Sequence, residues 1–341
     1  MKAAILHGGN DLRFETVPDP TPAPNEVVLR VHACSICGSD LHAFHGAHPR
    51  IVFPRILGHE FAGEIVAVGR DVKNLKPGAR VCSDIDLSCG ACGPCREGRG
   101  NICDNLKTMG FDRDGAYAEY VATPAANVYA LPDAVTYDQA AIVQTLGISY
   151  HAVAHRVLPR PGEQVCVIGA GPIGLGAALI AALYSAEVTI VDLLDYRLAM
   201  AKKLGVHHVI NASNEDLVAR ALDITHGRRY DKVIEAVGGR QEQSIQSAIN
   251  VVKRGGKITV IGTFPDNRAT IPIAFIKDRE IDLIFSRGNF QAFQPCIDLI
   301  AQGRINPEPY ISHRMPLTQA EQALELMHAK GQEVHKVVLH P

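Results

Sequence analysis

The sequence predicts an α/β protein built from a β-rich, barrel-like domain and a doubly wound parallel sheet. Residues 1 to about 145 contain short β-branched runs separated by glycine and proline turns, a pattern typical of short strands. From about residue 145, apolar strands alternate with helical segments, which is the chain order of a parallel sheet. A glycine-rich turn follows the first of those strands. The length of 341 residues also favours two domains over one.

Each half of the chain supplies its own set of expected strands. In the first part they cover Glu26–Val31, Glu64–Val68, Ala79–Cys82 and Tyr117–Val121. In the second part they cover Gln164–Ile168, Glu187–Val191, His208–Ile210, Lys232–Ile234, Lys257–Ile261 and Ile281–Phe285. Helices are expected between consecutive strands of the second part, as a doubly wound sheet requires.

The last stretch, from about residue 287, returns to a mixed pattern. It contains a helix over Phe293–Ala301 and a final strand over Lys336–Leu339. A second helix is expected to begin at Thr318, because Thr318 and Glu321 have the spacing of a capping box.

Composition and charge argue against nucleic-acid and membrane partners. Hydrophobic residues make up 47% and charged residues 21%, and the formal net charge is −2, with lysine and arginine scattered. A zinc ribbon that binds nucleic acid is therefore disfavoured. No apolar run reaches membrane-spanning length, and the first residues lack the apolar core of a signal peptide, so we expect a cytoplasmic protein.

Four of the nine cysteines fall within fifteen residues, in the spacing C-x2-C-x2-C-x7-C. They are Cys89, Cys92, Cys95 and Cys103. In a cytoplasmic chain such a cluster favours metal binding over disulfides. Four thiolates complete the tetrahedral shell of Zn²⁺ and leave no open position, which is typical of a structural site. An iron–sulfur cluster, which similar spacings hold, and a chance cluster are the alternatives.

A second metal site is suggested by Cys37 and by the segment Gly58-His59-Glu60. A thiolate from Cys37 and an imidazole from His59 suit zinc, and Glu60 offers a carboxylate. A catalytic zinc keeps one position for water or substrate, where it lowers the pKa of a bound hydroxyl. Taken singly, each of these residues is more often a packing residue than a ligand.

The glycine-rich turn carries the dinucleotide fingerprint G-x-G-x-x-G in residues Gly169, Ala170, Gly171, Pro172, Ile173 and Gly174. Because it follows a strand and opens a helix, we expect the pyrophosphate of a dinucleotide at the helix N-terminus. Asp192 ends the next strand, and its carboxylate would bind ribose hydroxyls and repel a 2′-phosphate, which favours NAD over NADP. The nearby Arg197 weakens that preference.

Further residues follow the later strands of the predicted sheet. Val237 and Ile261 lie at the ends of two of them, and ligands bind at that edge, so both are expected on the nicotinamide side. A loop without a ligand is the alternative at each position.

Together these features resemble the zinc-containing medium-chain dehydrogenases, which include alcohol, sorbitol and threonine dehydrogenases. The resemblance covers essentially the whole chain. It implies a GroES-like catalytic domain formed by residues 1–146 and 287–341, with an NAD-binding Rossmann domain over residues 147–286. It also places Ser286 and Arg287 near the cofactor, where the chain returns to the catalytic domain, and it implies a homo-oligomer, a tetramer or a dimer.

The resemblance also implies roles for residues around the second metal site. Cys37 and His59 would bind the catalytic zinc, and Glu60 would be an adjacent or alternating ligand. Ser39 would hydrogen-bond the substrate hydroxyl, and His42 would be a later member of the proton relay. Asp40 would orient His59, as metal-bound imidazoles require.

One position departs from the family pattern. In sorbitol-dehydrogenase-like chains a further zinc ligand is a glutamate followed by Pro-Leu, whereas the aligned stretch here is Val143-Gln144-Thr145-Leu146. Gln144 therefore takes the ligand position, and a neutral amide is a weaker ligand than a carboxylate. Zinc would be held by Cys37, His59 and Glu60 instead, through water, or only weakly.

The function predicted from the sequence is an NAD-dependent, zinc-dependent oxidoreductase acting on a small molecule. Its substrate would be a secondary hydroxyl of a polyol, sugar alcohol or sugar acid. The alternatives are an enzyme like L-threonine 3-dehydrogenase, and a non-catalytic nucleotide-binding relative whose zinc site is weakened at Gln144.

Overall fold

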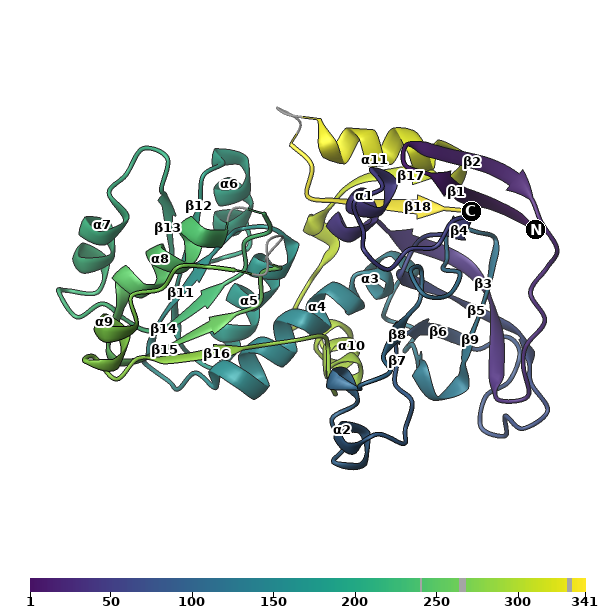
Figure 1. The fold of residues 1–341 in the computed structure, drawn as a ribbon, viewed down its shortest axis with the longest axis horizontal. Helices are drawn as coiled ribbons and strands as arrows, with labels where there is room; N and C mark the ends of the chain where they lie inside the picture. The colour runs from purple at the N-terminus through teal and green to yellow at the C-terminus, as the bar shows by residue number, and fades with distance from the viewer. Residues whose placement is uncertain (240, 264–267, 330–332) are drawn as a thin grey trace. The chain divides into compact units, whose positions relative to one another are not determined.

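The computed structural model describes residues 1–239, 241–263, 268–329 and 333–341 (Figure 1). The chain divides into two compact units. Unit 1 comprises Met1–Gln144 and Phe293–Pro341, and unit 2 comprises Thr145–Ala292. Unit 1 is thus discontinuous in sequence, with unit 2 inserted between its two segments.

The expected barrel-like domain takes the form of a seven-stranded sheet in unit 1 (Figure 1). Its strand order is β10-β6-β5-β3-β18-β17, and β9 pairs with β3 outside this path. In chain order the strands are β3 (Glu26–Ser35), β5 (Glu60–Val68), β6 (Arg80–Ser83), β9 (Tyr120–Pro124), β10 (Val128–Ala130), β17 (Ile311–Pro316) and β18 (Lys336–His340). Strand β18 brings the end of the chain between β3 and β17.

Two smaller sheets and short helices complete unit 1. The sheets have the orders β2-β1-β4 and β7-β8. Their strands are β1 (Lys2–Gly8), β2 (Asp11–Thr16), β4 (Arg55–Ile56), β7 (Asp86–Leu87) and β8 (Lys107–Thr108). The helices are α1 (Gly38–Phe44), α2 (Gly93–Arg96), α3 (Tyr137–Ala141), α10 (Phe293–Ala301) and α11 (Ala320–His328), with 3₁₀ turns at Gly100–Ile102, Ala125–Asn127, Glu308–Tyr310 and Leu317–Gln319.

The longest strand pair of unit 1, β3 with β5, fixes the position of the later site residues. The pair is antiparallel, and its register places Ser35 opposite Glu60. Leu29 and Ile65, in the middle of the two strands, are fully buried in the apolar core. A one-residue slip would turn these side chains to the other face, so core burial holds the register.

Unit 2 is a six-stranded parallel sheet in the order β13-β12-β11-β14-β15-β16. This is the doubly wound Rossmann order, which confirms the predicted fold class. The strands are β11 (Gln164–Ile168), β12 (Glu187–Asp192), β13 (His208–Asn211), β14 (Tyr230–Glu235), β15 (Val252–Val260) and β16 (Asp282–Phe285). The helices are α5 (Pro172–Leu183), α6 (Asp195–Lys203), α7 (Leu217–Ile224), α8 (Gln241–Val251) and α9 (Ile273–Lys277). Helix α4 (Val143–Tyr150) and a π-helix (His151–Val157) precede the sheet.

Two local expectations were wrong. Helix α11 begins at Ala320 after a 3₁₀ turn, so Gln319 rather than Thr318 is its N-cap and the expected capping box does not form there. A capping box forms instead at Thr136 and Gln139, at the start of α3. Strand β9 begins at Tyr120 instead of Tyr117, because the buried Tyr117 bonds through its backbone to Leu57 and Ala4.

Within the described ranges, every helix is too short or too polar to span a lipid bilayer.

Candidate metal centres and nucleotide-binding loop

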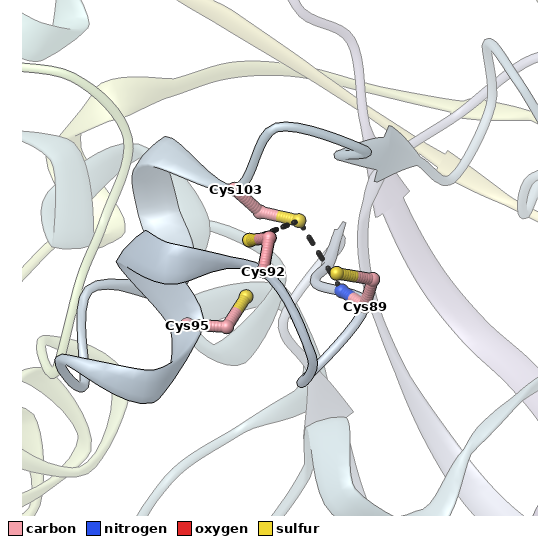
Figure 2. A group of neighbouring side chains, drawn as sticks. All are labelled: Cys89, Cys92, Cys95 and Cys103. Atoms are coloured by element: carbon pink, nitrogen blue, oxygen red, sulfur yellow. Dashed lines mark hydrogen bonds between the residues drawn. The ribbon is translucent and has the colours of Figure 1, made fainter.

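The four-cysteine lobe brings all of its expected ligands together. The sulfur atoms of Cys89, Cys92, Cys95 and Cys103 lie within 4.8 Å of one another (Figure 2). The Sγ atoms of Cys92 and Cys103 are 3.8 Å apart, and the backbone N–H groups of Cys89 and Asn105 each donate to Sγ of Cys103 at 3.3 Å. Backbone N–H groups of Ala91 and Cys92 lower the pKa of the Cys89 thiol to about 6. Burial raises the pKa of Cys95 to about 12, so the convergence of four sulfurs, and not their acidity, carries the fit to a closed tetrahedral zinc site.

The second cluster consists of Cys37, His59 and Glu60, whose ligand atoms also lie within 4.8 Å of one another. Cys37 is the N-cap of α1, and His59 and Glu60 stand at the start of β5. Gly58 allows the turn that presents them: its φ is +89°, and a Cβ there would lie 2.3 Å from the Tyr117 ring. Three donors of mixed type leave room for another ligand, which fits an open zinc site.

The buried Asp40 carboxylate contacts two members of this second cluster, Cys37 and His59. Its Oδ2 accepts hydrogen bonds from the Cys37 backbone N–H at 2.9 Å and from the Tyr117 hydroxyl at 3.1 Å. Its Oδ1 lies 3.2 Å from Nδ1 of His59, within ion-pair distance. Burial lowers the pKa of His59, but Asp40 and Cys37 together outweigh burial and hold that pKa well above its usual range. The His59 ring therefore has Nδ1 fixed on Asp40, which leaves Nε2 for a metal ion.

Ser39 contacts two members of the second cluster, and His42 is an exposed residue of the same helix. The Ser39 hydroxyl donates to Sγ of Cys37 at 3.1 Å, and it is 3.4 Å from Nε2 of His59. His42 has an exposed side chain. It follows Ser39 by three residues on α1, so the two side chains share one face of the helix.

Glu60 has partners that the sequence did not predict. Its Oε2 accepts hydrogen bonds from the Ser35 hydroxyl and from the Lys336 ammonium group. The Lys336 and Glu60 side chains are only 4% and 2% exposed. The Lys336 ammonium also donates to the backbone carbonyl of Ile36 at 3.1 Å. The sequence predicted Lys336 only as the first residue of a strand. Lys336 and Glu60 are 276 residues apart in the chain, so no local spacing indicates that they pair.

Gln144 is 6% exposed, and its amide oxygen has no hydrogen-bond partner among the described residues. An orphaned buried carbonyl oxygen is costly unless something else pairs with it. The amide oxygen of Gln144 is therefore a chemically suitable metal ligand.

An aromatic ring beside His59, and a second ring stacked on it, were also missed. The Phe111 ring centroid lies 4.8 Å from that of His59, and the His48 ring stacks on Phe111 at 4.1 Å. Burial, then the nearby charge of Arg50, lowers the pKa of His48. Neither residue belongs to a spacing pattern that could have been recognised in the sequence.

In unit 2 the glycine-rich loop has the geometry that a phosphate cradle needs. Gly169 has a φ of +102°, and a Cβ on Gly174 would lie 1.8 Å from the Gly169 carbonyl oxygen. A Cβ on Gly171, by contrast, would meet nothing within 4 Å. Helix α5 begins at Pro172 without a side-chain cap, so its first N–H groups are available to an anion. The residues of the loop thus fit a bound pyrophosphate.

Asp192 is tied to that loop. Its Oδ2 accepts from the Ala170 N–H at 2.7 Å, and its Oδ1 accepts from Leu193 and Leu194. Arg197 lies 3.6 Å from the same carboxylate. The loop and the acidic residue therefore form one connected group at the carboxyl edge of the sheet.

The remaining expected cofactor residues lie along this edge. Val237 follows β14, and its N–H donates to the Glu235 carboxylate at 3.1 Å, while Ile261 follows β15 and donates to the Glu235 carbonyl at 2.8 Å. Ser286 follows β16 with a backbone bond to Val260, and Arg287 beyond it is exposed. Glu235, which joins these segments, was not predicted; burial raises its pKa.

Comparison with known proteins identifies the family. An alcohol dehydrogenase GroES-like domain model matches residues 23–133, and a zinc-binding dehydrogenase model matches residues 172–302. Sorbitol dehydrogenase from Bacillus subtilis is 35% identical over 100% of this chain and 97% of its own. L-threonine 3-dehydrogenase from Bacillus licheniformis is also 35% identical, over 100% and 99%.

The chain belongs to the zinc-binding alcohol and polyol dehydrogenases. Among solved structures, a protein from Sinorhizobium meliloti described as a zinc-binding dehydrogenase bound to NADP superposes with a TM-score of 0.94. It is 30% identical, and the match covers 100% of this chain and 99% of the other. The predicted family and the predicted two-part fold are both confirmed.

Proposed function

We propose that this protein is an NAD-dependent zinc dehydrogenase that oxidises a secondary hydroxyl of a polyol, sugar alcohol or sugar acid. The observation that carries the proposal is the second cluster, in which Cys37, His59 and Glu60 converge and the Ser39 hydroxyl bonds to the cysteine sulfur. Family membership and the phosphate cradle at Gly169–Gly174 support it.

In this proposal, Cys37 and His59 hold the catalytic zinc, with Glu60 or the amide oxygen of Gln144 as the further ligand. When bound, the zinc supplies Lewis acidity that lowers the pKa of the substrate hydroxyl. Asp40 keeps the His59 ring in one orientation and one tautomer, because Nδ1 faces its carboxylate at 3.2 Å.

The proton of the substrate hydroxyl leaves through Ser39 and then His42. Ser39 is suited to the first step because its hydroxyl both donates and accepts. His42 is suited to the second because its exposed ring exchanges protons with water and shares a helix face with Ser39.

The second substrate, NAD, binds at the carboxyl edge of the unit 2 sheet. The N–H groups at the start of α5 hold the pyrophosphate, and Gly171 leaves the space for its approach. Asp192 favours NAD because its carboxylate accepts ribose hydroxyls and repels a 2′-phosphate. Arg197, 3.6 Å from Asp192, offsets part of that repulsion, so we expect preference rather than exclusion.

A polyol or a related sugar derivative is the first substrate class, in line with the sorbitol dehydrogenase relative. L-threonine is the second candidate, because the L-threonine 3-dehydrogenase relative is equally similar over the whole chain. The remaining candidate, a non-catalytic nucleotide binder, is motivated by Gln144 in place of an acidic ligand.

The test uses zinc-replete protein with NAD⁺ and with NADP⁺. Formation of reduced nicotinamide is followed by its near-ultraviolet absorbance across polyols, sugar acids, simple secondary alcohols and L-threonine. We expect turnover of a polyol or sugar acid, with a higher kcat/KM for NAD⁺. If L-threonine were the only compound oxidised, L-threonine would replace polyols and sugar acids as the proposed substrate. Calorimetric binding of NAD⁺ without turnover of any compound would favour the non-catalytic relative.

The cytoplasmic location and the homo-oligomer remain predictions. Sedimentation of the purified protein measures the second directly, and we expect a tetramer or a dimer.

A further inference from the structure

Glu60 pairs with Lys336 and also belongs to the group of side chains that could hold a metal ion. Its carboxylate belongs to the cluster with Cys37 and His59, so it is within reach of a metal ion held there. The same carboxylate receives the Lys336 ammonium group and the Ser35 hydroxyl on its Oε2. Because Lys336 and Ser35 both engage Oε2, ligation of zinc by both carboxylate oxygens of Glu60 would compete with these contacts.

Lys336 is held in place by its strand and by its hydrogen bonds. It is the first residue of β18, which pairs with β3 through Val338 and Ser35. Its ammonium group is fixed by a second hydrogen bond, to the carbonyl of Ile36 at 3.1 Å. Its side chain is 4% exposed and that of Glu60 is 2% exposed, so removal of one partner would leave a buried charge without its counter-charge.

Among the described charged groups that contact the second cluster, Lys336 supplies a positive charge. Two carboxylates, Asp40 and Glu60, and the Cys37 thiolate carry three negative charges around a bound divalent ion. The ion and Lys336 together carry three positive charges. Without Lys336 these groups would carry one uncompensated negative charge, and the Glu60 carboxylate would be attracted more strongly to the metal.

We propose that Lys336 is a positioning residue that holds Glu60 away from full ligation of the metal and so keeps a coordination position open. Ser35 assists by occupying the same carboxylate oxygen. This inference rests on the metal centre proposed above, and it concerns the coordination number of that centre.

The test is the visible spectrum of protein in which the second site is loaded with Co²⁺ while the four-cysteine lobe retains zinc. In the Lys336→Met variant, Glu60 is expected to turn to the metal and raise its coordination number, which weakens and shifts the d–d absorption. Release of Co²⁺ to a chelator should become ~10-fold slower, since charges beside metal ligands change affinity by about that much or more.

Three variants make the result specific. Lys336→Arg keeps the charge and should keep the wild-type spectrum. The double variant Lys336→Met with Glu60→Gln removes the competing carboxylate, and it should lose the spectral change seen in Lys336→Met alone. Lys232→Met, which removes a lysine paired with Glu163 at 3.7 Å in unit 2, is the matched control and should leave the spectrum unchanged.

The inference fails if the Lys336→Met spectrum and release rate equal those of the wild type, or if its Co²⁺ leaves faster. The Cys37→Ala variant reports on the centre itself. If wild type and Cys37→Ala bind the same amount of Co²⁺ with the same spectrum, the proposed catalytic site is absent, and the proposed function fails together with this inference.

Discussion

The two metal-ligand clusters of unit 1 differ in how their ligands are assembled. The four-cysteine lobe takes all its expected ligands from one short segment, residues 89–103. Two of these cysteines are partly exposed, one is exposed and one is buried. The second cluster takes Cys37 from the N-cap of α1, His59 from the residue before β5 and Glu60 from the start of β5. Its supports come from Tyr117 and from β18. With a metal bound, the first would be a closed shell built locally, whereas the second would be an open shell built by the tertiary fold.

This difference teaches what each cluster does for the molecule. A closed shell with local ligands stabilises a lobe that has little apolar core, and it leaves nowhere for a substrate. An open shell needs rigid surroundings, because the orientation of each ligand must be fixed by groups outside the shell. The contacts of Asp40 and of Lys336 are surroundings of that kind.

The largest expected effect is a loss of catalytic activity when the second cluster, but not the four-cysteine lobe, loses a ligand. Cys37→Ala removes a ligand of the open shell, so kcat/KM should fall by more than ~100-fold, since loss of an outer partner alone costs ~10- to 100-fold. Steady-state kinetics measures the fall, and metal analysis should still find the zinc of the four-cysteine lobe. Retained activity in this variant would contradict the assignment of the second cluster as catalytic.

The next largest effect is a loss of bound zinc and of local stability when the four-cysteine lobe loses a ligand. Cys103→Ser opens the closed shell, so the protein should lose one equivalent of zinc, and limited proteolysis should begin to cut within residues 89–103. The loss of a structural metal belongs to the most destabilising class of changes, above about 4 kcal/mol for the structure that depends on it. Mass spectrometry and proteolysis are the measurements. A variant with full zinc content would show that three thiolates suffice.

A smaller effect tests the support of the open shell. Asp40→Asn keeps the size of the side chain but removes the charge facing His59 at 3.2 Å. Because the amide no longer fixes the tautomer of His59, zinc affinity should fall by ~10- to 100-fold. Chelator competition measures the affinity. Unchanged zinc affinity would mean that Tyr117 and the backbone position the cluster without Asp40.

The smallest effect concerns the departure from the family pattern. Gln144→Glu places a carboxylate where the amide oxygen is now buried without a partner, so zinc affinity should rise by up to ~10-fold if this residue faces the metal. Chelator competition measures the affinity, and Gln164→Glu on β11 of unit 2 serves as the matched control. No rise would remove Gln144 from the ligand set.

The sequence predicted best the features whose residues are close together in the chain. The four-cysteine spacing and the fingerprint at Gly169–Gly174 need only local geometry, and the alternation around them predicted the parallel sheet. The capping box at Thr318 was wrong because the buried Leu317 begins a 3₁₀ turn that shifts the helix start.

What the sequence could not predict depends on contacts between distant segments. Lys336, Tyr117 and Phe111 reach the second cluster only through the pairing of strands and the burial of their side chains. A single lysine or aromatic residue has no spacing that distinguishes it from an ordinary strand or loop residue. The orphaned oxygen of Gln144 likewise becomes visible only once its burial is known.

The insertion of β18 between β3 and β17 also sets an order of assembly on the ribosome. All strands of unit 2 are synthesised before β17 and β18, so unit 2 can acquire its core while unit 1 still lacks two strands of its main sheet. The nascent chain carries Cys37, His59 and Glu60 for almost the whole of translation before the lysine that neutralises Glu60 emerges. We therefore expect the second cluster to be completed only after β18 has joined the sheet, whereas the four-cysteine lobe has all its expected ligands once residue 103 has left the exit tunnel.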